Sequence, residues 1–152
     1  MSVVPPTWQR PELLAETIAH VREQDYPNIE HVVINDGPYD ERVFNALTKA
    51  GRVVGGTDGS RVTLQHVDLG RNWSGLMPAS FGIAPLLVGY LAAGGEYLLN
   101  WSDDARALTP SHISKLVDLL EATGADFVYP KVRIWRNGDP DGPETAIIGT
   151  AP

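Results

Sequence analysis

Apolar and polar residues follow one another along this chain in blocks that predict strands and helices in turn. Short apolar or β-branched runs have the length of strands; they span residues 2–5, 31–35, 62–67, 96–101, 126–129 and 131–135. Apolar residues that recur every three or four positions predict helices at residues 11–24, 40–50 and 76–93, and from 109 to just before 124. This alternation is typical of an α/β fold with three layers, in which helices cover both faces of a mostly parallel, Rossmann-like sheet.

Prolines and capping residues mark the expected boundaries of these elements. Pro11 suits the first turn of the first helix, and Thr109 is expected to cap the last helix with Pro110 in its first turn. Residues 51–60 are rich in glycine and predict a loop, and residues 137–143 predict an exposed turn.

Polar and aromatic side chains follow three of the predicted strands. They are Pro6, Thr7 and Trp8 after the first strand, Asp36 after the second, and Ser102, Asp103 and Asp104 after the fourth. Ligands of open α/β sheets bind beyond the carboxyl ends of the strands, so we expect these groups to meet in one crevice. An aromatic ring can stack on a base, a carboxylate can accept the imide hydrogen of uracil, and an Asp pair with a divalent cation can hold a pyrophosphate. Together these groups would bind uridine diphosphate.

Each of these groups also has a simpler explanation when it is taken alone. Trp8 would pack at a strand end, and Asp36 would form an Asx turn before Gly37. The Asp pair would be a solvated turn in which Asp104 helps to start the next helix. The four histidines show no spacing that suggests a shared metal, so we expect them to be structural or surface residues.

Composition narrows the classes of protein. A chain of 152 residues with 43% apolar content suits one core and one domain. The net charge of −7 argues against a nucleic-acid polymer as partner, and the lack of cysteine excludes disulfides, thiolate zinc sites and a cysteine nucleophile. The most apolar stretch, Ile83–Ala93, is too short to span a bilayer, and no signal peptide is recognised, so we expect a soluble cytoplasmic protein. No Gly-x-Gly-x-x-Gly or Walker-type loop supports a dehydrogenase or a P-loop enzyme.

The order of the motifs resembles the family 2 glycosyltransferases, which have the nucleotide-diphospho-sugar (GT-A) fold. Residues 2–14 are similar to the opening strand and nucleotide loop of that family, and residues 24–39 to its second strand and Asp-Asp-Gly turn. Residues 95–97 lead into the metal motif, in which residues 102–104 stand for an Asp-any-Asp triplet. The resemblance therefore covers nearly the whole chain.

The resemblance implies a metal-dependent, inverting transferase of the hexosyltransferase type that uses a UDP-sugar donor and an unknown glycan, lipid or protein acceptor. Trp8 would stack on the base, Asp36 would read uracil, and Asp103 would contact ribose or the donor sugar. Asp104 would bind Mn²⁺ or Mg²⁺. The full set of implied nucleotide and donor contacts is Pro6, Thr7, Trp8, Arg10, Asp36, Ser102 and Asp103.

Several positions depart from the family pattern. Pro5 replaces a branched aliphatic in the first strand, Asn35 replaces the first acid of the Asp-Asp-Gly turn, and Ser102 replaces the first acid of the triplet. Residues 79–81 stand where the family has Ala-Arg-Asn, and Arg71 is a weak substitute for that arginine.

No catalytic base is identified in the sequence. Family members continue into an acceptor-binding half, whereas this chain stops at Pro152; Asp139, Asp141 and Glu144 would serve only if their loop folded over the site. We therefore expect residues 1–152 to form a single donor-binding domain truncated on its acceptor side. The alternative is a non-catalytic nucleotide-sugar-binding module that needs a second copy or a partner subunit for the acceptor site.

Overall fold

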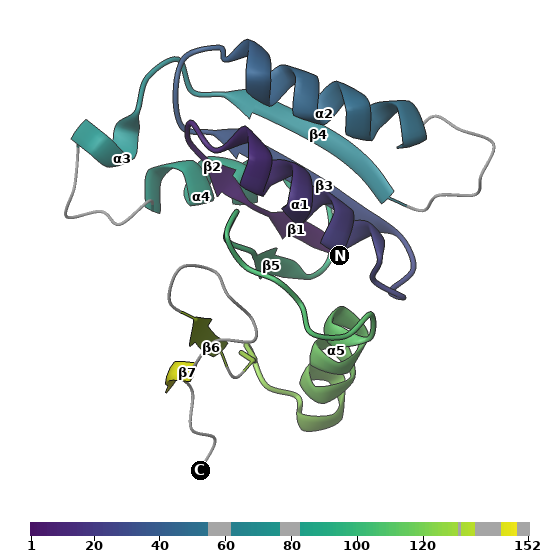
Figure 1. Ribbon diagram of the computed structural model, residues 1–152. Coiled ribbons are helices and arrows are strands. Elements are labelled where there is room, and N and C mark those ends of the chain that lie inside the picture. Colours follow the sequence, from purple (N-terminus) through teal and green to yellow (C-terminus); the bar gives the residue numbers. More distant parts are fainter. Residues whose placement is uncertain (55–61, 77–82, 131, 136–143, 149–152) are drawn as a thin grey trace. The chain divides into compact units, whose positions relative to one another are not determined.

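The computed structural model describes residues 1–54, 62–76, 83–130, 132–135 and 144–148 (Figure 1). The backbone forms two compact units, an N-terminal unit of residues 1–110 and a C-terminal unit of residues 111–152, and each is described by itself. That the whole chain acts as one domain stays a prediction.

The N-terminal unit contains a sheet whose described strands are all parallel. Their spatial order is β4 (Val62–Asp68), β3 (Ile29–Asn35), β1 (Ser2–Val4) and β5 (Leu98–Asn100), and the short β2 (Pro6–Thr7) continues β1 alongside β3. The predicted first strand is broken at Pro5, because proline has no N–H to give to the ladder. Its carbonyl still accepts the N–H of Ile34 at 3.2 Å, so the chain keeps its direction and resumes pairing at Pro6.

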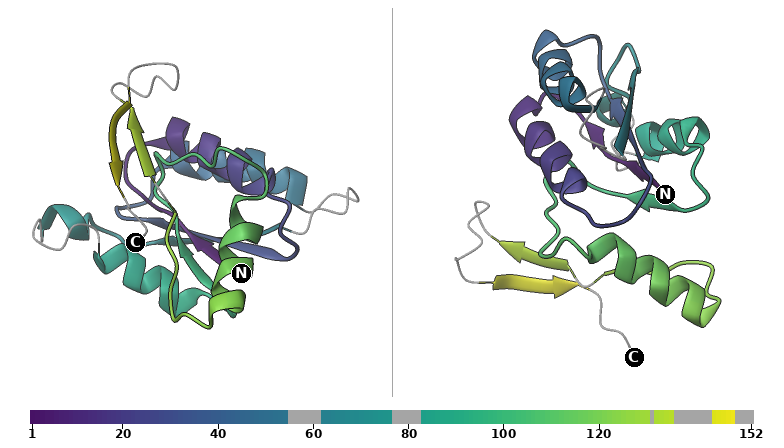
Figure 2. Two further views of the ribbon diagram at one scale, coloured as in Figure 1. Left: turned by 90° about the horizontal axis from the view of Figure 1, so that it is seen from below. Right: turned by 90° about the vertical axis from the view of Figure 1, so that its right-hand side faces the viewer.

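Helices cover both faces of this sheet (Figure 2). The helices α1 (Pro11–Arg22) and α2 (Glu41–Val54) lie on one face, and α4 (Ile83–Ala92) lies on the other. A separate apolar cluster lies between the sheet and the helices on each face. Leu14, Ile18, Val33, Val43 and Leu47 form the first cluster, and Val4, Val32 and Ile34 form the second with Leu86, Val88 and Tyr90 of α4 packed against them. The predicted three-layer α/β fold is confirmed.

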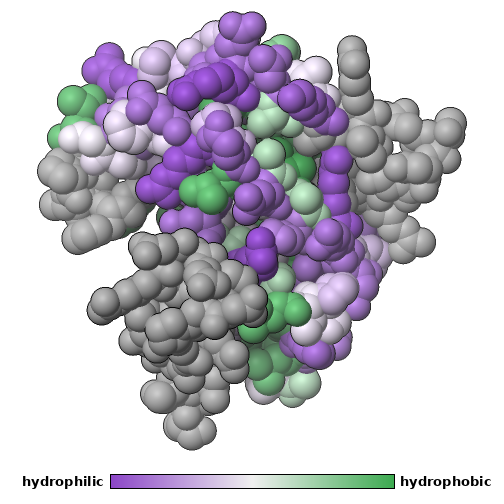
Figure 3. Space-filling model, in the orientation of Figure 1, coloured by the Kyte–Doolittle hydropathy of each residue, from purple (hydrophilic) through white to green (hydrophobic). Residues whose placement is uncertain are grey.

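The helix α4 approaches the sheet closely. Gly89 of α4 lies so near the sheet that a Cβ there would come within 2.2 Å of Val4 Cγ1, so a larger residue would push the helix away. The outer surface over α1 and α2 is mainly hydrophilic (Figure 3), as expected for helices that bury one apolar stripe.

The strand order defines where a ligand would bind. From β1 the chain crosses to β3 and β4 on one side of the sheet, and later returns to β5 on the other side of β1. This reversal places a topological switch point between β1 and β5, and crevices of α/β sheets open at the carboxyl ends of such strands. Residues 6–10 and 101–104 follow these strand ends.

The C-terminal unit contains α5 (His112–Thr123) and an antiparallel pair of strands, β6 (Val132–Trp135) and β7 (Glu144–Ile148). The strand β7 was not expected from the sequence. The expected strand at residues 126–129 is wrong, because that segment pairs with no strand of the described part of the chain. As expected, α5 ends before Gly124, which adopts a left-handed conformation with φ of 63°.

The predicted start of that helix is wrong. Ser111 stands at its N-cap position, and both Thr109 and Pro110 lie before the helix. Their carbonyls instead hold the turn after α1: Thr109 accepts Gln24 Nε2 at 3.3 Å, and Pro110 accepts the N–H of Asp25 at 2.9 Å. Long-range hydrogen bonding therefore outweighs the local capping preference.

Two other predicted segments are only partly described. Residues 51–54 continue α2, and residues 55–60 of the predicted loop lie outside the described residues, as does the predicted turn at 137–143. The predicted helix at 76–93 is represented by α4 and by the end of the short helix α3 (Trp73–Leu76), while residues 77–82 lie outside. In the part of the chain that the structure describes, no helix combines the length and apolar character needed to cross a bilayer.

Candidate functional site

The loop between β2 and α1 carries three of the predicted site residues. Thr7 is buried, whereas Trp8 and Arg10 are each about half exposed. Gln9 has a positive φ of 54°, which turns the chain sharply before Pro11 opens α1. This turn leaves the Trp8 ring and the Arg10 guanidinium free to face a ligand.

The loop after β5 is fixed to the sheet by Trp101. Its backbone N–H donates to Val4 O at 3.3 Å, and its indole N–H donates to Ala105 O at 3.0 Å. Ala105 in turn donates its N–H to Ser102 O at 3.1 Å, which closes a tight turn. Residues 102–104 therefore project from a short, well-anchored loop at the switch point.

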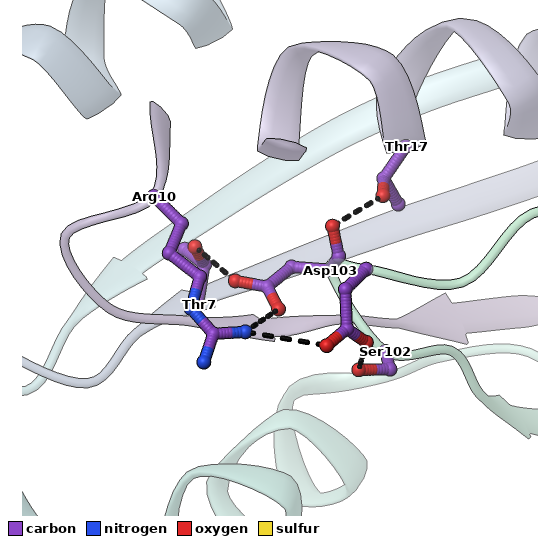
Figure 4. Close-up of polar contacts among 6 residues, drawn as sticks. Thr7, Arg10, Thr17, Ser102 and Asp103 are labelled. Carbon is purple, nitrogen blue, oxygen red and sulfur yellow. Dashed lines mark hydrogen bonds and ion pairs between the residues drawn. The ribbon is translucent and has the colours of Figure 1, made fainter. Parts of the chain in front are cut away.

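Asp103 is the centre of the polar contacts between these two loops (Figure 4). Thr7 Oγ1 donates to Asp103 Oδ2 at 2.8 Å, and Arg10 Nη1 lies 3.1 Å from Asp103 Oδ1. Thr17 of α1 donates its hydroxyl to the Asp103 carbonyl at 3.0 Å. The structure thus joins the ends of β2 and β5 through one carboxylate.

The environment of Asp103 disfavours its charge. Burial raises the pKa of Asp103 above its usual range, and the neighbouring Asp104 carboxylate raises it further. The hydrogen bond from Thr7 and the charge of Arg10 lower the pKa in part. The carboxylate is therefore incompletely compensated, as is typical of functional sites.

Asp104 is more exposed and has two partners. Ser102 Oγ donates to Asp104 Oδ1, and Arg10 Nη1 lies 3.4 Å from Asp104 Oδ2. The hydroxyl and carboxylate oxygens are hard donors that suit Mg²⁺ or Mn²⁺. Among the described residues no three His, Asp or Glu side chains gather as a metal site, so a cation here would complete its shell with water or substrate oxygens.

Asp36 is buried at the end of β3, and its carboxylate caps α3. Its Oδ1 accepts the N–H of Trp73 at 2.8 Å, and its Oδ2 accepts the N–H of Ser74 at 3.0 Å. The N–H of Asp36 donates to Thr7 O at 2.8 Å. Each oxygen keeps a second lone pair, so the carboxylate can still accept a hydrogen bond from a ligand. Sequence reasoning missed this long-range cap.

Asn35 explains one departure from the family pattern. Its side-chain Nδ2 donates to Asp68 Oδ1 at 2.6 Å and to Pro38 O at 2.9 Å. An aspartate at this buried position would bring a second carboxylate against Asp68, with no hydrogen to donate. The amide is therefore matched to the acid at the end of β4.

The predicted nucleotide and donor contacts meet in one cleft of about 310 Å³, whereas the predicted metal ligand does not line it. Its lining contains Pro6, Thr7, Trp8, Arg10, Asp36, Ser102 and Asp103, together with Asn72, Ser74 and Pro85, which the sequence analysis did not assign. Asn72 and Ser74 follow β4, so the strand-end rule would have found them. Asp104 is not part of this lining and contacts it through Arg10.

Trp8 lines this cleft and also a second one of about 270 Å³. The ring packs on the backbone of Gly37, where a Cβ would come within 3.0 Å of Trp8 Cδ1. Packing and an exposed face therefore coexist in this side chain.

The remaining candidates are not brought to the cleft. The Arg71 guanidinium lies 5.1 Å from the centre of the Trp73 ring, a cation–π contact, and is not in the cleft lining. Residues 79–81, Asp139 and Asp141 lie outside the described residues, and Glu144 is the first residue of β7.

Residues 2–73 match the family model described as Glycosyl transferase family 2. Among solved structures, the chain is similar to TarS of S. aureus, with 21% identity and a TM-score of 0.63 over 82% of this chain and 20% of that one. S. aureus TarS 1-349 is similar with 20% identity and a TM-score of 0.64 over 82% of this chain and 33% of that one. No curated protein sequence matches the chain.

A third similar structure is the mannosyltransferase PcManGT from Pyrobaculum calidifontis in complex with GDP-Man and Mn²⁺, with 21% identity and a TM-score of 0.61 over 78% of this chain and 31% of that one. This chain spans between a fifth and a third of the length of these three structures. The family match and the shared GT-A fold confirm the resemblance to family 2 glycosyltransferases.

Proposed function

We propose that this chain, whose residues 2–73 match glycosyl transferase family 2, is the donor-binding part of a metal-dependent, inverting glycosyltransferase. The observation that supports this most is the convergence of three strand ends on one cleft. An aromatic face, a buried carboxylate and an Asp pair line or border a space of about 310 Å³ at the switch point of the sheet.

Each part of the cleft suits one part of a nucleotide diphosphate. Trp8 offers a half-exposed ring for the base, and Asp36 has free lone pairs for a base N–H. Asp104 and Ser102 would hold Mn²⁺ or Mg²⁺, which when bound would neutralise charge on the leaving diphosphate. Asp103 would contact ribose or the donor sugar.

We propose uridine as the base, because a single carboxylate that accepts hydrogen bonds suits the imide hydrogen of uracil. The similar PcManGT structure contains GDP-Man, so guanosine is the competitor to test. The acceptor, a glycan, lipid or protein, and the catalytic base would be contributed outside the described cleft.

A non-catalytic donor-binding module is the second candidate. The observation that supports this candidate is that both carboxylates in the lining of the described cleft, Asp36 and Asp103, already accept hydrogen bonds from other residues, so neither is a free catalytic base. In this case a second copy or a partner subunit would supply the acceptor site.

The two candidates differ in what happens to a bound donor. We would incubate the protein with UDP-glucose, UDP-N-acetylglucosamine and GDP-mannose in Mn²⁺ and measure release of the nucleotide diphosphate. A transferase is expected to release UDP slowly by hydrolysis, with loss of release in chelator and in Asp104→Asn. Asp118→Asn, an exposed carboxylate of α5, is the matched control and is expected to behave as wild type. Binding without release supports the module, and absence of both overturns the proposal.

A further inference from the structure

Arg10 occupies an unusual position in the cleft, because one of its nitrogens bridges both acids of the Asp pair. Arg10 Nη1 lies 3.1 Å from Asp103 Oδ1 and 3.4 Å from Asp104 Oδ2. Figure 4 shows the guanidinium pointing from the β2–α1 loop toward Asp103. The arginine therefore supplies positive charge beside Asp104, the carboxylate that would bind a divalent cation.

We infer that Arg10 is an internal counter-ion of Asp103 and Asp104 that competes with the divalent cation for Asp104, and that it moves to the phosphates of the donor once the cation is bound. This inference rests on the proposed function. It assigns to Arg10 two opposite effects, one on the metal and one on the nucleotide.

The contact of Arg10 with Asp104 is of the kind that can be exchanged. Its side chain is 53% exposed and that of Asp104 is 56% exposed, and ion pairs with this exposure are weak. Its backbone is fixed, because the Arg10 carbonyl accepts the N–H of Leu14 at 3.0 Å in the first turn of α1. Release of the guanidinium thus breaks the ion pairs with Asp103 and Asp104 and rotates the side chain, but it requires no change in the backbone.

The Asp103 loop does not depend on Arg10 for its position. Thr7 and Thr17 hold the carboxylate and the carbonyl of Asp103 through hydroxyl donors, and Trp101 anchors the same turn. When Arg10 leaves, these contacts stay in place. The acid pair would therefore keep its arrangement while its counter-ion changes.

The charges that line the cleft indicate which ligand group the released Arg10 would bind. Among the described residues that line the cleft, Arg10 is the sole basic side chain, beside the carboxylates of Asp36 and Asp103. A diphosphate needs cationic partners, and guanidinium matches phosphate oxygens well. A divalent cation at the acids would repel the guanidinium, and the entering phosphate would attract it.

The test is a pair of titrations on wild type and Arg10→Gln. In the first, free Mn²⁺ is followed by electron paramagnetic resonance without nucleotide, and Arg10→Gln is expected to bind Mn²⁺ about tenfold more tightly, since a competing charge is removed. In the second, UDP is added at saturating Mn²⁺, and the same variant is expected to bind UDP about tenfold more weakly. Arg10→Lys, which keeps the charge, is expected to lie between.

The matched control is Arg42→Gln, which removes an exposed arginine paired with Asp40 outside the cleft and is expected to leave both affinities unchanged. A purely structural role for Arg10 would weaken both ligands together, and that result overturns the inference while wild-type binding of Mn²⁺ and UDP upholds the proposed function. A wild-type protein that binds neither ligand overturns both.

Discussion

The acidic turn after β3 and the acidic turn after β5 lie at the same edge of one sheet, but their carboxylates are held by different kinds of donor. Asp36 accepts backbone N–H groups from the first turn of α3, which can leave only if that turn unwinds. Asp103 and Asp104 are held by side chains of Thr7, Arg10 and Ser102, which can leave by rotation. The turn after β3 therefore suits a carboxylate that holds a base in a fixed position. The turn after β5 suits an acid pair that exchanges its partners for a ligand.

Burial alone does not separate the two turns. Asp36 is 3% exposed and Asp103 is 5% exposed, so both carboxylates are shielded from water to a similar extent. The contrast comes from the donors that hold each acid, and substitutions at both turns test it.

The largest expected effect is the loss of stability on removing the β3 acid. Asp36→Ala would leave two backbone N–H groups without their charged acceptor, and should lower the free energy of unfolding by about 3 kcal/mol. Asp103→Ala should cost less than half as much, because burial of that carboxylate is incompletely compensated. Urea denaturation measures both, and equal losses would contradict the contrast.

Restoring the family acid on the β3 side is the next largest change. Asn35→Asp would place a carboxylate against Asp68 and should lower the free energy of unfolding by about 2–3 kcal/mol near neutral pH. The double variant Asn35→Asp with Asp68→Asn restores a donor and an acceptor, and is expected to recover most of the loss. A tolerated single substitution would show that the two side chains separate at little cost.

Removal of the Trp8 ring tests whether this side chain stacks on the base that Asp36 is proposed to bind. Trp8→Ala should weaken UDP binding by about 1–3 kcal/mol, the usual contribution of base stacking on an aromatic ring. Phe44→Ala, which removes an exposed aromatic from α2, is the control and should leave the affinity unchanged. Unchanged affinity in Trp8→Ala would make that residue a packing residue only.

The smallest expected effect is a pH dependence that differs between the two strands. Burial, with the nearby charge of Arg22, lowers the pKa of His31 on β3 from 6.5 to about 3, and neither ring nitrogen has a hydrogen-bond partner among the described residues. Below pH 6.5 His31 is protonated in the unfolded chain but stays neutral in the folded protein. Stability therefore falls as the pH drops from about 6.5 toward 3.

At pH 5.5 this effect of His31 lowers the free energy of unfolding by about 1.4 kcal/mol. His31→Leu should remove it, while His20→Gln should keep the wild-type dependence; urea denaturation at pH 7.5 and 5.5 measures the difference. Asp103 acts in the opposite sense, because a raised carboxyl pKa in the folded state favours folding as the pH falls. A His31→Leu variant with the full acid sensitivity of wild type would contradict this account.

Much of the fold follows from local patterns in the sequence. The strand-end rule brought Thr7, Asp36 and Asp103 to one cleft, because the carboxyl ends of parallel strands share an edge. What the sequence did not reveal depends on contacts between distant residues. The cap of α3 by Asp36, the Asn35–Asp68 pair and the shift of the α5 start from Thr109 to Ser111 all join segments that lie far apart in the chain or compete with a local preference.

The bridge made by Arg10 belongs to the same class. A guanidinium with several rotatable bonds can reach many partners, so no spacing in the sequence indicates that one nitrogen meets both Asp103 and Asp104. By contrast, Pro5 departs from the family pattern in the sequence itself, and the structure shows the resulting break between β1 and β2.

The most direct test of the donor site is a calorimetric titration of UDP into the wild-type protein and Asp104→Ala, each in Mn²⁺ and in chelator. We expect wild type to bind UDP more tightly in Mn²⁺ than in chelator, and Asp104→Ala to keep its fold and lose this difference. A titration of GDP under the same conditions shows whether the cleft prefers uracil to guanine. Equal UDP affinity in Mn²⁺ and in chelator, or no binding in either, would contradict a metal-dependent donor site at the ends of β2 and β5.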